Sequence, residues 1–319
     1  MRRVLIPLIA LVVLAAIAAV SATSAAARPR GTNGKILINR ADNSATGEEQ
    51  TFTVDPDGTD FTLLANNSEA GQWSWDGTRI AMFEGFLDFD SGVFTSLNLD
   101  TQYPDMFLGC ALWSPDDSRL ACEGFGLTDP SLNGIYTVRS SDGGDLQPVT
   151  SNPGGDDCPS DYSPSGNRIV FTRENETTPR AVYTVRPDGS GLRRISPAAL
   201  NVNLCNGSWS PQGNEILLSA HQPNFEYHSS MWLLHANGTG LRQIPAPDCG
   251  GLNADPAGVG CFNPSWSPDG KKIVFGRQVD DQPRDIFTIN ADGSGLFQVT
   301  NTPDIEEFNA EWGIHPLTP

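Results

Sequence analysis

The stretch Phe262 to Trp312 reads FNPSWSPDGKKIVFGRQVDDQPRDIFTINADGSGLFQVTNTPDIEEFNAEW, and most of the chain repeats its pattern. One short apolar run ends at Trp266, and further β-type runs cover Lys271 to Phe275, Asp285 to Asn290 and Leu296 to Thr300. The turn SPDG fits a tight hairpin, because proline fixes φ and glycine tolerates positive φ. One unit is therefore predicted to be a four-stranded antiparallel meander.

The aromatic residue that opens the turn motif recurs along the chain, with intervals of 40, 49, 47, 57 and 46 residues. A period of roughly 40 to 50 residues with four strands in each unit is the signature of a propeller blade. The repeat aromatics are Trp73, Trp113, Tyr162, Trp209, Trp266 and Trp312.

The two ends of the repeat region complement each other. Gly34 to Ile38 matches Gly270 to Phe275, so this segment is a second strand, and the strand ending at Trp312 is a first strand without a blade behind it. Joining them predicts an all-β, six-bladed propeller of four-stranded antiparallel blades. The C-terminal strand closes the ring on the N-terminal blade, which leaves no open sheet edge around the circle.

The sequence WSPDGKKIVF followed by DIFTINADGSGLFQVT resembles the WD40-like (PD40) repeat of TolB-type propellers, over about residues 34–313. The same repeat occurs in the propeller domains of prolyl oligopeptidases and of some secreted lyases. The resemblance implies the fold and does not imply one activity. The α/β domain that precedes the propeller in TolB is not expected here.

Residues 1–27 are predicted to be a signal peptide. Arg2 and Arg3 form a basic start, Val4 to Val20 is apolar, and small residues precede a cleavage position after Ala27. The alternative is a retained membrane anchor, although the apolar stretch lies at the lower edge of spanning length. Residues 28–319 then form a single propeller domain, secreted or periplasmic, of a bacterial protein.

The chain is strongly acidic. After removal of residues 1–27, 18 basic residues remain against 38 acidic ones, a formal charge of −20. Such a surface repels phosphate backbones and anionic membranes, which argues against nucleic acid as a partner. The acidic residues are spread along the loops, and this spread favours a role in solubility.

Six cysteines in an exported chain indicate three disulfides, although six cysteines allow 15 pairings. A hairpin centred on Asp116 places one pair on facing strands, a second pair brackets a glycine-rich insertion, and the third lies at matching places in adjacent blades. A metal site is disfavoured because no C-x-x-C spacing occurs. The predicted pairs are Cys110 with Cys122, Cys249 with Cys261, and Cys158 with Cys205.

A turn in the first blade has carboxylates at alternate positions, Asp55, Asp57 and Asp60, which resembles half of a calcium loop. Most other blades carry a similar turn at the same place, so a structural role is favoured over Ca²⁺ binding. In the second blade, Glu84 to Ser91 is predicted to be an apolar loop insertion. The fourth strand of that blade is expected to be short or absent, because Tyr103 to Asp105 contains a proline.

Loops at one mouth of the channel are the usual ligand sites of this architecture. Arg40, Glu84, Arg173 and Arg277 occupy one equivalent position of the repeat, next to loops at that mouth. Such a ring of charge suits a polar ligand or peptide carboxylates. The favoured alternative is ion pairing between blades that only holds the rim.

Two histidines, His221 and His228, lie in the segment AHQPNFEYHSS. They suggest a metal site of the kind that TolB-like pectate-oligomer lyases hold with His and Gln, but no further His from a neighbouring blade accompanies them. No G-x-S-x-G motif occurs, which argues against a serine hydrolase.

The leading hypothesis is a secreted, non-catalytic scaffold that binds a protein or peptide at the channel mouth, as a monomer and without a cofactor. The predicted polar contacts are Arg173, Arg277, Asp280, Asp281 and His221. The alternative is a secreted carbohydrate-active enzyme, lyase-like, with a transition metal on His221 and His228.

Overall fold

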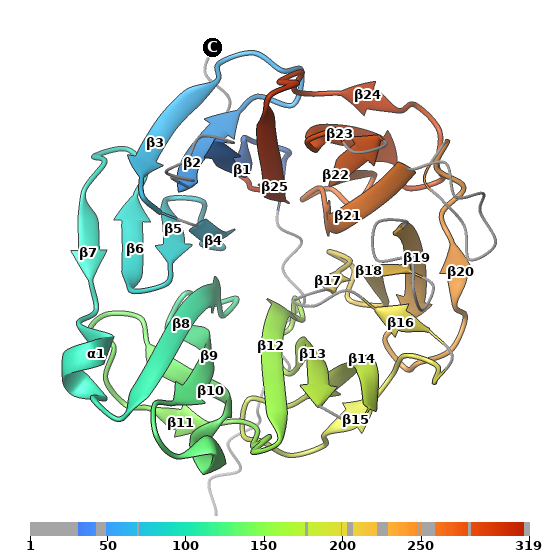
Figure 1. Cartoon of the computed structure of the whole chain (residues 1–319). Helices are drawn as coiled ribbons and strands as arrows, with labels where there is room; N and C mark the ends of the chain where they lie inside the picture. Colours follow the sequence, from blue (N-terminus) through green and yellow to red (C-terminus); the bar gives the residue numbers. More distant parts are fainter. Residues whose placement is uncertain are drawn as a thin grey trace, which may run out of the picture.

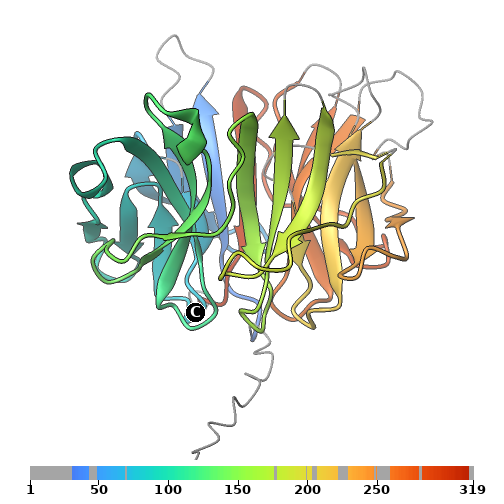
Figure 2. The ribbon, with the colours of Figure 1, turned by 90° about the horizontal axis from the view of Figure 1, so that it is seen from below.

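The computed structural model describes residues 31–42, 49–68, 70–175, 178–198, 200–202, 207–221, 229–247, 249, 259–279 and 282–315, without the side chains of Pro179, Asn201 and His221. Within these residues, the strands form six antiparallel sheets that stand around a central axis (Figures 1 and 2). This arrangement confirms the six-bladed propeller. The predicted signal peptide lies outside the described residues.

Each blade runs from an inner first strand to an outer fourth strand. Blade one contains β25 (Ile305–Trp312), β1 (Ile36–Asp42), β2 (Glu49–Val54) and β3 (Thr62–Asn66). Blade two contains β4 (Ala70–Trp73), β5 (Arg79–Met82), β6 (Gly85–Asp88) and β7 (Phe94–Ser96). Blade three follows the short helix α1 (Leu99–Gln102) and contains β8 (Met106–Trp113), β9 (Arg119–Gly126), the 3-10 turn η1 (Pro130–Leu132), β10 (Gly134–Arg139) and β11 (Gln147–Pro148).

The other three blades repeat this order. Blade four contains β12 (Gly155–Tyr162), β13 (Ile169–Asn175), β14 (Thr178–Val185) and β15 (Arg193–Arg194). Blade five contains β16 (Asn201–Val202), β17 (Ser208–Trp209), β18 (Glu215–His221), β19 (Ser230–His235) and β20 (Arg242–Gln243), and both β16 and β17 pair with β18. Blade six contains β21 (Val259–Trp266), β22 (Lys272–Val279), β23 (Asp285–Asn290) and β24 (Phe297–Gln298).

Among the described residues, no helix has the length and apolar character needed to cross a membrane.

The ring closes as the sequence predicts. β25 pairs antiparallel with β1, with Ile36 opposite Trp312 and Arg40 opposite Glu307. Trp312 is buried, and its indole N–H donates to the carbonyl of Gly34 over 2.9 Å. The first blade therefore combines the two ends of the repeat region in one sheet.

The SPDG turn is held by its own side chains. The Ser267 hydroxyl accepts from the backbone N–H of Lys272 over 2.8 Å and donates to Asp269 over 2.8 Å. Asp269 also accepts from the N–H of Lys271 over 3.0 Å, and Gly270 has a φ of 71°. The motif thus builds a hairpin, which explains its recurrence without a ligand.

The core lies between neighbouring blades. Leu217 and Leu233 of blade five pack in one buried cluster with Trp266, Ile273 and Phe275 of blade six. The repeat aromatics are all buried, because each ends a first strand and fills the contact between two blades.

Two predicted disulfides are confirmed, Cys110 with Cys122 and Cys249 with Cys261. Cys158 is also disulfide-bonded, and its predicted partner Cys205 lies outside the described residues.

One of the two predictions for blade two is wrong. Gly85 to Asp88 is the third strand, β6, joined to β5 by a tight turn at Phe83 and Glu84, and it is not a loop insertion. Leu87 is buried opposite Ile80, so the alternation in GFLD is that of a half-buried strand. The fourth strand, β7, is short, as predicted, although it precedes α1 and hence the proline.

Candidate functional site

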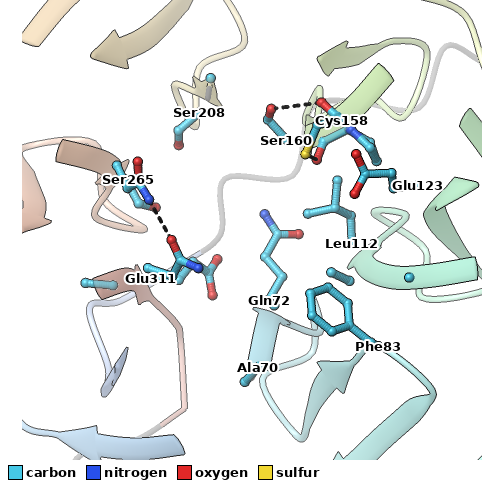
Figure 3. Close-up of a pocket in the computed structure, with 18 of the residues that line it drawn as sticks. Ala70, Gln72, Phe83, Leu112, Glu123, Cys158, Ser160, Ser208, Ser265 and Glu311 are labelled. Carbon is cyan, nitrogen blue, oxygen red and sulfur yellow. Dashed lines mark hydrogen bonds between the residues drawn. The ribbon is translucent and has the colours of Figure 1, made fainter. Parts of the chain in front are cut away.

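The first strands of all six blades surround a cavity of about 210 Å³ on the propeller axis. Figure 3 shows the side chain of Gln72 reaching toward its middle, with Glu123 at the wall beside Cys158 and Leu112. Small residues such as Gly71, Ala111 and Ser160 form much of the remaining wall, which keeps the cavity open.

At two places around the channel, the carboxylate residue that precedes a repeat aromatic holds its blade to the next blade. Glu311 accepts from the backbone N–H of Trp73 over 2.9 Å, and Asp161 accepts from that of Trp209 over 2.9 Å. The carboxylates of Glu311 and Asp161 are therefore used in holding one blade to the next.

Gln72 crosses the channel. Its amide nitrogen, on β4 of blade two, donates to Asp161 on β12 of blade four over 3.2 Å, past the intervening blade. This contact narrows the channel at the level of the cavity.

Glu123, on β9, differs from Glu311, the other carboxylate that lines the cavity. The side chain is partly buried and, among the residues that the structure describes, no hydrogen bond or ion pair to its carboxylate is found. Burial, together with the nearby carboxylates of Asp156 and Asp157, raises the pKa of Glu123 from 4.5 to about 7. A group with this environment in a cavity is a candidate for function.

The structure shows ion pairs for two arginines of the predicted charged ring. Each of them binds a carboxylate of its own blade. Arg173 binds Asp157 with two contacts of 2.6 Å, and Asp157 is 1% exposed. Arg40 binds Glu307 over 2.7 Å in the same manner. Both pairs join the first and second strands of one sheet, so they hold the rim within a blade and not between blades.

The remaining predicted contacts are only partly described. Arg277 lies with its guanidinium carbon 5.1 Å from the ring centroid of Phe287. His221 ends β18, its side chain is not described, and Asp280, Asp281 and His228 lie outside the described residues.

Apolar side chains of blades two and three lie next to the cavity, at the end of each blade where the second strand leads into the third. Phe83 lines the cavity and is 39% exposed, and Phe107 is 47% exposed and stacks on Phe125 with a centroid separation of 6.4 Å. A Cβ at Gly109 would lie 3.2 Å from Phe83, closer than most such contacts, so glycine favours the close approach of this ring, and Phe107 lies at ordinary contact distance, 3.5 Å. Leu127, 63% exposed, follows β9 at the same end. We call Phe83, Phe107, Phe125 and Leu127 the apolar rim.

The described residues do not fit a metal centre. No group of three or more His, Cys, Asp or Glu side chains among them is placed to hold a metal ion. In the first blade, the Lys35 ammonium lies 2.8 Å from Asp55 and 2.6 Å from Asp60, and Asp57 accepts from Thr59. A lysine therefore already holds the position that Ca²⁺ would need.

Replacing Glu123 by glutamine is expected to stabilise the protein at pH 8 by about 1 to 3 kcal/mol. Because the folded-state pKa of Glu123 is raised, the folded state binds the proton more tightly than the unfolded state, and stability falls as pH rises from 4.5 to about 7. Glutamine cannot ionise, so the variant escapes this loss. Urea unfolding at pH 8 and pH 4.5 measures the difference, which should vanish at the lower pH.

The control is Asp105→Asn, which removes an exposed negative charge near the apolar rim. This variant should be as stable as the parent protein at both pH values. Equal stability of Glu123→Gln and the parent protein at pH 8 would show that the carboxylate is well solvated.

Comparison with known proteins gives similarity in structure alone. TolB from Acinetobacter baumannii superposes with a TM-score of 0.66 at 16% identity, covering 88% of this chain, which spans 66% of that TolB chain. A chain of the nidogen/laminin complex gives 0.60 at 10% identity, covering 89% of this chain and 100% of the other. An oligogalacturonate lyase in complex with manganese gives 0.53 at 11% identity, covering 85% and 86%. No protein-family model and no curated protein sequence matches the chain. The fold is thus that of TolB-like propellers.

Proposed function

We propose that this protein is a secreted, non-catalytic scaffold whose channel mouth receives a segment of a partner protein. The observation that carries the proposal is the apolar rim, which continues into the axial cavity through Phe83. Exposed aromatic residues beside a recess are typical anchors of protein interfaces. The similarity to a propeller chain in the nidogen/laminin complex, itself a complex of proteins, supports the same function.

Export is part of the proposal. The predicted signal peptide and the bonded cysteines both suit an oxidising compartment, the periplasm or the extracellular space. Arg173, Arg277, Asp280, Asp281 and His221 remain predicted polar contacts around the mouth, with Arg173 acting through its pair with Asp157.

The test is capture of partners from the envelope and medium of the producing cell. The bait Phe107→Ser/Leu127→Ser removes two exposed apolar side chains from the mouth. Val93→Ser/Phe94→Ser removes two from the outer edge of blade two, where the exposure is similar, 58% and 46%. We expect the parent and the edge variant to retain the same partner, and the mouth variant to bind it at least about tenfold more weakly.

Retention by the mouth variant with loss by the edge variant would place the partner on the outer strands and contradict the proposal. A parent bait that retains no protein would remove its main support.

A second candidate function is favoured by one comparison, the lyase in complex with manganese. In this chain the metal would be sought at His221 and His228, outside the described side chains. The test is metal analysis of the purified protein and an assay for cleavage of a sugar polymer. Stoichiometric transition metal that is lost in His221→Ala/His228→Ala, together with cleavage, would favour the enzyme function over the scaffold function.

A further inference from the structure

We propose that the axial cavity binds one lysine or arginine side chain of the partner segment, with the Glu123 carboxylate as its counter-charge. This inference rests on the proposed function and names the chemistry of the segment that enters the mouth. The segment would place an apolar residue on the apolar rim and a basic residue next to it.

The cavity has the size of a side-chain pocket. Its volume of about 210 Å³ is below the range of about 300 to 1,000 Å³ that is usual for small-molecule sites. The Gln72 side chain, which crosses to Asp161, takes up part of the channel at this level. One extended side chain therefore fits the recess better than a whole ligand.

The wall suits a long basic side chain. Phe83, Leu112 and Ala111 offer apolar surface for an alkyl stem, and the Glu123 carboxylate offers an acceptor for the charged head. Lysine and arginine are the side chains that combine such a stem with a cation.

The charges around Glu123 favour a cation over an anion. The charged groups near it on β12 are Asp156 and Asp157, and Arg173 on β13 is already bound to Asp157. Glu174, beside Asp156, is paired with Arg180. A ligand carboxylate would meet uncompensated negative charge at Glu123, whereas a cation would neutralise it.

Binding should therefore depend on pH. Because the pKa of Glu123 is about 7, the carboxyl is largely neutral at pH 6 and largely ionised at pH 8. A cation prefers the ionised form, so the affinity should rise between these two values.

The experiment uses capped tripeptides as probes, acetyl-Phe-Lys-Phe-amide, its arginine analogue, and acetyl-Phe-Nle-Phe-amide, in which norleucine keeps the stem without the charge. Binding to the mature protein is followed by NMR titration at pH 8 and pH 6. We expect the basic peptides to bind at least about tenfold more tightly than the norleucine peptide at pH 8, about 1.4 kcal/mol. The preference should shrink at pH 6.

Glu123→Gln should abolish the preference, whereas Asp105→Asn, which removes one exposed carboxylate outside the cavity, should keep it. Glutamine has nearly the same shape, and a retained unfolding transition shows that the variant is folded. Equal binding of the lysine and norleucine peptides, a preference that survives Glu123→Gln, or no detectable binding at about 10 mM peptide would each overturn the inference.

The outcomes of the peptide titration can be distinguished from those of the partner-capture experiment. A partner lost only by the mouth variant, together with no peptide preference, would keep the scaffold and reject the basic side chain. A Glu123-dependent preference without any captured partner would keep the pocket and reject the scaffold.

Discussion

Replacing Trp312 by alanine is expected to lower the free energy of unfolding by about 3 to 5 kcal/mol, the cost of truncating a large buried aromatic side chain. Trp312 is 1% exposed, packs with Ile36 and Val54, and donates its indole N–H to the Gly34 carbonyl. The substitution therefore removes core packing at the point where β25 closes the ring on β1. Urea unfolding at pH 7 measures the loss.

The matched control is Trp266→Ala, which removes an equally large buried side chain from a blade that does not contain the closing strand pair. Hydrogen exchange distinguishes the two variants. With Trp312→Ala, the amides of β1 and β25 should lose protection before those of the other blades. Uniform loss of protection in both variants would show that the closure is no weaker than the rest of the ring.

The second large effect is expected from Arg173→Met. The substitution leaves the Asp157 carboxylate buried, 1% exposed, without its cation, and loss of one member of a buried ion pair costs about 3 to 5 kcal/mol. Asp157 also accepts from Thr150 and Asn152, so its position in the blade is fixed and cannot relax easily into water.

The double variant Asp157→Asn/Arg173→Met should recover most of that stability, because no buried charge is left unpaired. Arg242→Met, which breaks the exposed pair with Glu215, is the control and should cost less than about 1 kcal/mol. Similar losses for Arg173→Met and Arg242→Met in urea unfolding would contradict a structural role of the buried pair.

The fold could be predicted because the residues that determine one blade recur in each repeat. The aromatic residue, the SPDG turn and the alternating strand recur together, and the unmatched strands at the two ends determine the closure of the ring. Blade two was mispredicted because GFLD follows β5 after a turn of only two residues, whereas the second strands of blades three, five and six lead into longer connections.

The site was harder to predict because neighbouring residues of one strand have different surroundings. The predicted charged ring contains Arg173, whose charge is used by Asp157. Glu123 and Phe83 occupy equivalent places in their repeats, one residue before the position of the charged ring, and both line the cavity. Comparison of that position among the repeats could have found them, but the absence of a partner for the Glu123 carboxylate depends on side-chain geometry that repeats do not encode.

The strand pair that joins β1 to β25 also bears on how the molecule folds. It brings together Ile36 and Trp312, from opposite ends of the repeat region, and such distant contacts slow folding because a long loop must close first. During synthesis, one edge of β1 would stay unpaired until β25 has been made. Fragments that lack β25 would keep this edge, where an extended strand of another chain could take its place.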